Sequence, residues 1–150
     1  MAGIARALLD EMVAHSRDAL PNEACGMVHA VDGVATSVHR VTNAAASPYR
    51  YEMAPLEQLK LEQWRDAEGE TLFAIYHSHV ASEARPSPTD VNMAFWPPGE
   101  TTGAQMYPET LYVVVSLAEE TAPDRVVRAF HIVPGAAYED CLEEVTFAVT

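Results

Sequence analysis

The chain has 150 residues, 49% of them apolar, and a formal net charge of −13 at pH 7. This length and this apolar share suit one domain with a hydrophobic core, which argues against wholesale disorder. The negative charge repels phosphate backbones and argues against nucleic-acid binding, and no apolar run approaches the roughly 20 residues that span a membrane.

The acidic surplus itself has two interpretations. The sequence contains 22 acidic and 9 basic residues, and Lys60 is its one lysine. Acidic, lysine-poor surfaces are typical of proteins from salt-adapted organisms, which need strong solvation. The same field would also steer a substrate with a basic face toward the chain.

The cysteines and the N-terminus indicate the compartment. Cys25 and Cys141 are too few for a disulfide framework and indicate reducing surroundings. The first residues lack the basic start, apolar stretch and cleavage site of a signal peptide. We therefore expect a cytoplasmic protein.

Apolar periodicity and turn residues predict the elements of the first half of the chain. Asp32–Gly33 is a hairpin signal between two β-rich runs, Pro55 suits the first position of a helix, and Gly69 suits a helix end. The expected elements are a helix over 4–20, strands over 25–31, 34–41 and 49–53, and a helix over 55–69. The apolar side of that second helix is predicted to consist of Leu56, Leu59, Leu61 and Trp64.

The second half is predicted to complete an α/β domain. A continuous apolar run from Leu72 leads to His79 and is typical of a strand in the centre of a sheet. The segment 97–110 has no periodicity and is expected to be a long loop. The other expected elements are a short helix from Ser87, strands over 111–117 and 126–133 around an acidic turn at 119–124, and a tail over 138–149 that is either helix or strand. We predict a single domain over 1–150 with a central mixed β-sheet flanked by helices.

Three residues near the end of the strand predicted over 72–79 indicate a metal site. Side chains two apart on a strand point to the same face, so His77 and His79 project together. Asp90 follows after a loop that is able to fold back. Two histidines and one carboxylate are typical of catalytic zinc, because they leave a fourth position for water.

Two more residues are candidates for catalysis. Glu23, in the turn before the first strand, is a candidate base that takes a proton from water and passes it to a leaving amine. Ser87 is a candidate donor to the oxyanion of a tetrahedral intermediate. The run from Ser87 to Asp90 also suits a plain helix start, with serine as N-cap, proline next and an acid in the first turn. The two interpretations are compatible, because a helix start fixes where Asp90 points.

Together these residues resemble the JAMM (MPN-plus, or Mov34/MPN/PAD-1) zinc metalloprotease family. The shared pattern is Pro-x-Glu-x-Cys-Gly at 21–26 and His-x-His-x7-Ser-x2-Asp at 77–90. The resemblance extends from about Ile4 to Val133 and implies the family's cytidine-deaminase-like fold. It also implies these roles: zinc ligands His77, His79 and Asp90, general acid/base Glu23, and oxyanion support from Ser87.

Within that family, the short chain resembles the bacterial peptidases of sulfur metabolism. The similarity lies in the run from Tyr76 to His79 and in Pro86–Ser87, while Val80 departs from the proline that many members carry. Those peptidases remove cysteine or a short extension from a ubiquitin-like sulfur carrier that ends in Gly-Gly. The resemblance therefore implies a zinc-dependent, isopeptidase-type peptidase with such a carrier as its substrate and partner.

Two other functions stay open from the sequence. One is a non-catalytic scaffold of this fold, although such scaffolds have lost the ligand set that this chain retains. The other is a zinc amidohydrolase that acts on a small molecule; zinc deaminases need a Pro-Cys-x-x-Cys pair, which this sequence lacks. Outside the family pattern, Tyr49 and Tyr51 are expected to line a strand face, with contact to a substrate as the alternative.

Overall fold

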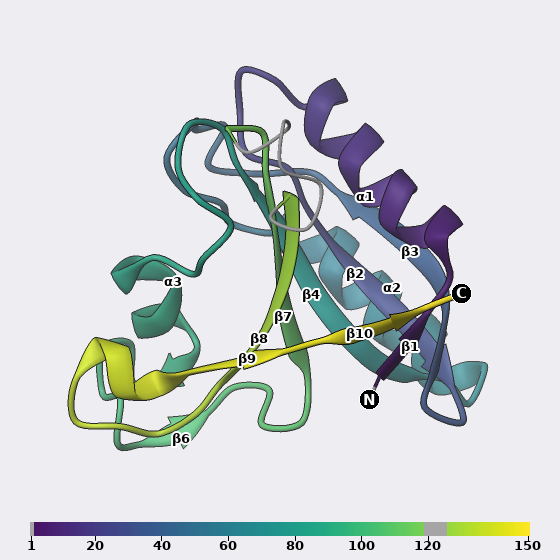
Figure 1. Cartoon of the computed structure of the whole chain (residues 1–150). Helices are drawn as coiled ribbons and strands as arrows, with labels where there is room; N and C mark the ends of the chain where they lie inside the picture. Colours follow the sequence, from purple (N-terminus) through teal and green to yellow (C-terminus); the bar gives the residue numbers. More distant parts are fainter. Residues whose placement is uncertain (1, 119–125) are drawn as a thin grey trace.

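The centre of the fold is one mixed β-sheet. A computed structural model describes residues 2–118 and 126–150, so the acidic turn predicted at 119–124 lies outside the described residues. In the described part, eight strands form this sheet in the order β10-β1-β3-β2-β4-β7-β8-β9 (Figure 1). They are β1 (Ala2–Ile4), β2 (Cys25–Val31), β3 (Val34–Val41), β4 (Thr71–His79), β7 (Leu111–Ser116), β8 (Val127–Ile132), β9 (Leu142–Val145) and β10 (Phe147–Val149).

The pairing of the strands confirms the predicted α/β fold class with a mixed sheet. β2 is antiparallel to β3 and β4, whereas β4 is parallel to β7. Only Thr146 separates β9 from β10, yet these strands stand at opposite ends of the strand order. The C-terminal stretch therefore crosses from one edge of the sheet to the other, as the yellow ribbon in Figure 1 shows.

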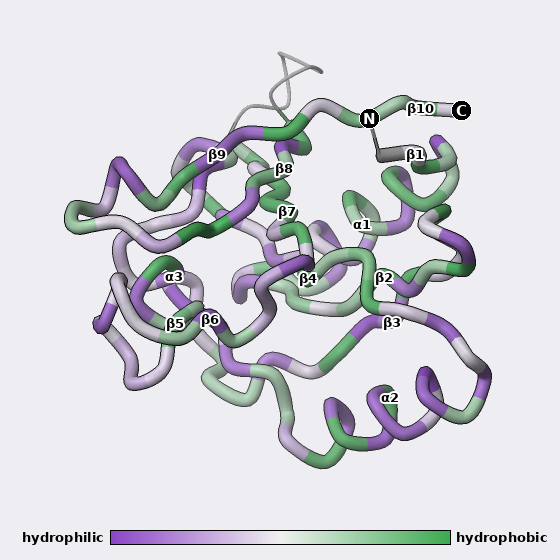
Figure 2. Tube along the Cα trace, turned by 90° about the horizontal axis from the view of Figure 1, so that it is seen from below, coloured by the Kyte–Doolittle hydropathy of each residue, from purple (hydrophilic) through white to green (hydrophobic). Residues whose placement is uncertain are grey.

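Two helices cover opposite faces of the strands around β4 (Figure 2). Met12 of α1 (Arg6–Asp18) packs in one hydrophobic cluster with Tyr76, whereas Leu61 of α2 (Pro55–Ala67) packs in a second cluster with Ile75. Because side chains alternate along a strand, residues 77 and 79 share the face of Ile75. The short helix α3 (Pro88–Met93) contributes Val91 to the same second cluster. None of the described helices is long and apolar enough to cross a membrane.

The predicted hairpin with its turn at Asp32–Gly33 is confirmed. β2 and β3 have the predicted bounds, and the turn residues Asp32 and Gly33 have φ angles of 52° and 78°. Positive φ at both central residues is what a type I′ turn requires, and this turn matches the twist of the two strands. Gly69, with φ of 69°, likewise follows the end of α2.

The strand predicted over 49–53 is wrong. In this segment Met53 alone pairs, in an isolated bridge with Asn43. The side chain of Asn43 donates to the Arg50 carbonyl at 3.1 Å and accepts from the Glu52 N–H at 3.0 Å. The amide of Asn43 therefore takes backbone bonds that a neighbouring strand would otherwise make.

The apolar side predicted for the second helix does not face the core as a whole. Leu56, Leu59 and Trp64 are exposed, whereas Arg65 is buried. The Arg65 Nη1 atom lies 3.3 Å from Nε2 of His29, a fully buried residue of β2. Arg65, with a polar partner on the sheet, therefore occupies part of the side of α2 that faces the core.

Three segments also differ from the predictions. Residues 2–4 pair with β10 and β3, so the first helix begins only at Arg6. The segment 97–110 contains β6 (Ala104–Gln105), which pairs with β5 (Phe95–Trp96). The tail is both helix and strand, because the 3₁₀ turn η1 (Tyr138–Cys141) precedes β9 and β10.

Gly26, within the predicted signature at 21–26, lies where two neighbours leave no room for a side chain. A Cβ atom at this position would overlap the His39 carbonyl oxygen and the Tyr76 ring. We expect Gly26→Ala to lower the free energy of unfolding by roughly 2–3 kcal/mol through overpacking. Gly3→Ala is the matched control, because no described atom lies within 4 Å of its new Cβ. Urea titrations of both variants measure the difference, and equal midpoints would contradict the packing described.

Candidate metal centre

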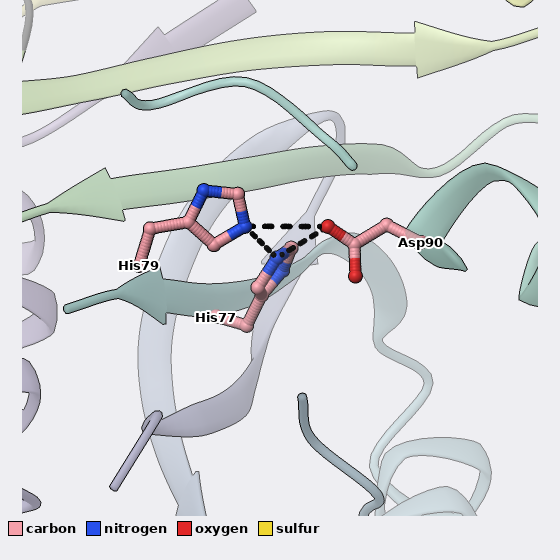
Figure 3. Close-up of side chains that lie close together, drawn as sticks. All are labelled: His77, His79 and Asp90. Atoms are coloured by element: carbon pink, nitrogen blue, oxygen red, sulfur yellow. Dashed lines mark hydrogen bonds and ion pairs between the residues drawn. The ribbon is translucent and has the colours of Figure 1, made fainter. Parts of the chain in front are cut away.

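Three side chains converge where β4 ends (Figure 3). The Nε2 atom of His77 lies 3.0 Å from Oδ2 of Asp90, and Nε2 of His79 lies 3.3 Å from the same oxygen. The two Nε2 atoms are 3.2 Å apart. In the described residues these three form a group whose ligand atoms all lie within 4.8 Å of one another. Two imidazole nitrogens and one carboxylate oxygen that face a common point fit a metal ion.

A hydrogen bond on the side away from Asp90 fixes the orientation of the His79 ring. Its Nδ1 atom lies 2.8 Å from the Glu83 carbonyl oxygen, which only accepts hydrogen bonds. Nδ1 therefore carries a proton, and Nε2 is the ring nitrogen that faces Asp90. A backbone carbonyl in this position is a common support for a metal-binding histidine.

The start of α3 sets the position of Asp90. The Ser87 Oγ atom accepts from the Asp90 N–H at 3.1 Å, and Asp90 Oδ2 accepts from the Ser87 N–H at 2.8 Å. This reciprocal capping box confirms the predicted helix start at Ser87. Burial opposes ionisation of Asp90, but His77, His79 and the Ser87 N–H outweigh it and hold the pKa of this carboxyl below its usual range.

The loop at 80–86 between the histidines and Ser87 is held by the rest of the fold. The Ser116 hydroxyl donates to the Ser82 carbonyl at 2.6 Å, and the Tyr138 hydroxyl donates to the Pro86 carbonyl. Ser116 ends β7 and Tyr138 begins η1, so both supports come from distant parts of the sequence. No periodicity or motif in the sequence points to either of them.

Glu23 lies in the electrostatic field of the group but is not one of its three members. The side chain is 4% exposed, and its Oε1 atom has no hydrogen-bond partner in the described part of the chain. Burial raises the pKa of this carboxyl to about 7, against a smaller opposing effect of His77 and His79. A carboxyl group with such a pKa can accept and release a proton near neutral pH.

The position of Glu23 depends on two polar side chains that the sequence analysis did not single out. The Ser78 Oγ atom, between the two histidines, accepts from the Ala24 N–H at 2.8 Å. The Asn43 side chain donates to the Glu23 carbonyl at 3.0 Å. Ser78 could have been noticed as the residue inside the His-x-His pattern, whereas Asn43 has no local signal.

A cavity of about 390 Å³ opens beside Asp90. Its walls come from the segment after β3, the start of α2, β4, α3 and the segment after β6. The lining is largely apolar, and Glu23 is not part of it. The lining residues are Arg50, Tyr51, Glu52, Met53, Pro55, Gln58, Ile75, Thr89, Asp90, Met93, Met106 and Tyr107.

The fold carries a group of three side chains that could hold a metal ion, together with a buried carboxyl group in their electrostatic field. The chain belongs to the family of prokaryotic homologs of the JAB domain, which its residues 5–133 match. This match confirms the resemblance to the JAMM family that the signature indicates.

Similar proteins include enzymes and a solved structure. The CysO-cysteine peptidase of Mycobacterium tuberculosis is 36% identical over 135 residues, which cover 89% of this chain and 84% of the relative. A desampylase of Haloferax volcanii is 35% identical over 96 residues, which cover 59% of this chain and 68% of the relative. A solution structure of a Desulfitobacterium hafniense protein matches with a TM-score of 0.78 and 31% identity, over all of this chain and 93% of that one.

The buried Glu23 carboxyl predicts a pH-dependent stability of the metal-free protein. Its pKa is about 7 in the folded chain against an ordinary value of 4.5, so its stabilising contribution is complete below pH 4.5 and is lost as the pH rises through 7. Glu23→Gln removes this dependence. We expect the stability advantage of Glu23→Gln over the unsubstituted protein to grow by about 2 kcal/mol from about pH 5.5 to pH 8.5.

Urea unfolding in the presence of a chelator measures this difference at the two pH values. Glu100→Gln is the control, because Glu100 is exposed and lies outside the site. A constant difference between Glu23→Gln and the unsubstituted protein across this range would contradict a buried, proton-binding Glu23.

Proposed function

We propose that this chain is a zinc-dependent peptidase of the isopeptidase type. Its substrate in this proposal is a ubiquitin-like sulfur carrier, which it cleaves after the C-terminal Gly-Gly or from which it releases an attached cysteine. The observation that carries the proposal is the convergence of His77, His79 and Asp90 beside the buried Glu23. Relatives named as a CysO-cysteine peptidase and as a desampylase support the choice of substrate.

In this proposal His77, His79 and Asp90 hold the zinc ion. Two nitrogens and one oxygen are the donor set of many catalytic zinc sites, and they leave a position for water or substrate. The zinc ion, when bound, would supply Lewis acidity toward the scissile carbonyl and would lower the pKa of a water molecule. His79 donates from Nδ1 to the Glu83 carbonyl, and the Ser87 N–H donates to Asp90. These two hydrogen bonds keep both ligands in their metal-binding orientation.

Glu23 moves the proton in the proposed reaction. Its carboxylate accepts a proton from the water molecule as the water oxygen attacks the carbonyl carbon of the last glycine. When the C–N bond breaks, the same proton passes from Glu23 to the leaving nitrogen. A pKa of about 7 suits both steps, because neither form of the carboxyl group is strongly favoured at neutral pH.

Ser87 would assist at the oxyanion. Its Oγ atom uses a lone pair to accept from the Asp90 N–H, which leaves the hydroxyl proton to donate elsewhere. A hydrogen bond from this proton to the developing oxyanion would stabilise the transition state. The capping role and the proposed catalytic role are therefore served by different parts of one hydroxyl group.

The cavity beside Asp90 is where we place the tail of the carrier. Since Glu23 delivers its proton to the leaving nitrogen, the leaving group lies on the side of Glu23. The cavity is lined by Asp90 but not by Glu23, so it suits the other side of the scissile bond. Its walls include Met53, Met93 and Met106, whose flexible side chains adapt to apolar groups of different shape.

We further propose that the whole chain acts as one metallopeptidase domain in the cytoplasm, in cysteine or sulfur-carrier metabolism. Cys25 and Cys141 are both buried and free thiols, which suits a reducing compartment. This location is independent of the catalytic proposal.

Glu23→Gln and Asp90→Ala test the assigned roles in a carrier-cleavage assay. Glu23→Gln should retain zinc and lose activity by roughly 100-fold or more, because it lacks the proton acceptor. Asp90→Ala should lose zinc on dialysis, because it removes one of three ligands. Metal analysis and cleavage of a carrier fusion with a Gly-Gly junction, with and without a chelator, measure both effects. Loss of zinc in Glu23→Gln, or cleavage that a chelator leaves unchanged, would contradict the proposal.

Met106→Trp tests the placement of the tail. Met106 is 47% exposed at the cavity, so an indole ring can narrow the cavity without disturbing the core. We expect KM for the carrier to rise by roughly tenfold while zinc content stays unchanged, because the change removes binding and spares the metal ligands. Leu59→Trp is the control, since Leu59 is exposed on α2 and does not line the cavity. Equal KM values for these two variants would exclude the cavity as the tail site.

A further inference from the structure

The two histidines of the metal centre are supported in different ways. His79 is held by the Glu83 carbonyl at its Nδ1 atom. His77 directs Nε2 at His79 and Asp90, but its Nδ1 atom is buried and has no hydrogen-bond partner in the structure described for 2–118 and 126–150. A metal-binding histidine normally donates this second N–H to a carboxylate, a carbonyl or water, which fixes the plane of the ring. The plane of His77 therefore needs another support.

An aromatic ring lies where that support is needed. The rings of Tyr51 and His77 are stacked, with centroids 4.6 Å apart and planes inclined by 24°. The His77 and His79 rings also meet edge-on, with centroids 5.0 Å apart and planes inclined by 64°. Contact with one flat ring and one edge limits rotation of the His77 imidazole about its χ2 angle.

Tyr51 is itself fixed relative to Glu23 through a single side chain. Asn43 accepts from the Glu52 N–H and donates to the Arg50 carbonyl. Arg50 and Glu52 are the residues on either side of Tyr51. The same amide group donates to the Glu23 carbonyl at 3.0 Å. Asn43 therefore connects the segment that carries the aromatic ring to the segment that carries the proposed base.

We propose that Tyr51 is a positioning residue of the metal centre, whose ring holds the plane of His77 in place of a hydrogen bond at Nδ1. This inference rests on the zinc assignment of the proposed function and adds to it a residue outside the family pattern at 21–26 and 77–90. The ring of Tyr51 carries this role, and the hydroxyl group is dispensable for it. Tyr51 also lines the cavity beside Asp90, so one residue borders both the ligand and the proposed tail site.

Substitutions at Tyr51 separate the ring from the hydroxyl group. Tyr51→Phe keeps the stack, so zinc affinity should stay within about twofold, whereas Tyr51→Leu should weaken zinc binding roughly tenfold, as loss of a ligand support does. Competition with a chromophoric chelator, in the absence of any substrate, gives both dissociation constants. Tyr49→Leu is the matched control, because Tyr49 is 89% exposed two residues away.

A second readout reports the geometry of the ligands directly. With Co²⁺ in place of zinc, the visible absorption bands should shift in Tyr51→Leu and stay unchanged in Tyr51→Phe and Tyr49→Leu. Unchanged affinity and bands in Tyr51→Leu would overturn the inference, and so would equal losses in Tyr51→Phe and Tyr51→Leu. If Tyr51→Leu fails to fold, nuclear Overhauser contacts between the Tyr51 and His77 rings in the unsubstituted protein decide, and their absence would also overturn it.

These measurements are independent of cleavage. A chain that binds zinc through this group but cleaves no carrier would contradict the proposed function and would leave the role of Tyr51 standing. If the unsubstituted protein cleaves the carrier and Tyr51→Leu binds zinc equally well, the proposed function would stand and the role of Tyr51 would be contradicted.

Discussion

The contact of Asp90 Oδ2 with the two Nε2 atoms, at 3.0 and 3.3 Å, ties α3 to the end of β4. The same oxygen accepts from the Ser87 N–H, so the start of the helix and the proposed metal site share one atom. The Asp90 side chain is only 10% exposed, and such a carboxylate needs positive or hydrogen-bonding partners, which the imidazoles and the helix start supply. This contact places Asp90 at the wall of the cavity, and the bond between His79 and the Glu83 carbonyl attaches the loop at 80–86 to the same group.

The site is built at a cost to the fold. Glu23 is 4% exposed and His77 is 1% exposed, and each has a buried polar atom without a hydrogen-bond partner among the described residues. A buried carboxyl group without a partner destabilises a folded chain, most of all when it is ionised. Ser78 and Asn43 hold the peptide group that joins Glu23 to Ala24, while Oε1 of the Glu23 carboxyl group has no hydrogen-bond partner among the described residues. This arrangement suits the proposed reaction, in which the Glu23 carboxyl group accepts and then releases a proton.

The sequence predicted those features that local chemistry decides. The hairpin bounds follow from the backbone preference of Asp32–Gly33, and the shared face of His77 and His79 follows from the alternation of a strand. The capping box follows from serine and aspartate three residues apart. The approach of Glu23 to the histidines, 54 residues further along, came from the family resemblance and not from any local pattern. The structure gives these residues positions, while their catalytic roles stay predictions.

The features that the sequence did not predict depend on distant partners. The bond network of Asn43 replaces the strand expected at 49–53, and Arg65 of α2 is buried against His29 on the sheet while Leu56 and Leu59 are exposed. Tyr138 supports the loop before Ser87 from near the C-terminus. None of these contacts has a periodicity or a turn signal, because each joins residues that only the folded chain brings together.

Anomalous diffraction at the zinc edge, from crystals of the zinc-loaded protein, tests the central claim most directly. The expected result is one strong peak within bonding distance of His77 Nε2, His79 Nε2 and Asp90 Oδ2, with the Glu23 carboxyl group close by but outside the coordination sphere. A peak elsewhere, or one in which Glu23 replaces Asp90 as a ligand, would contradict the assignment of these four side chains.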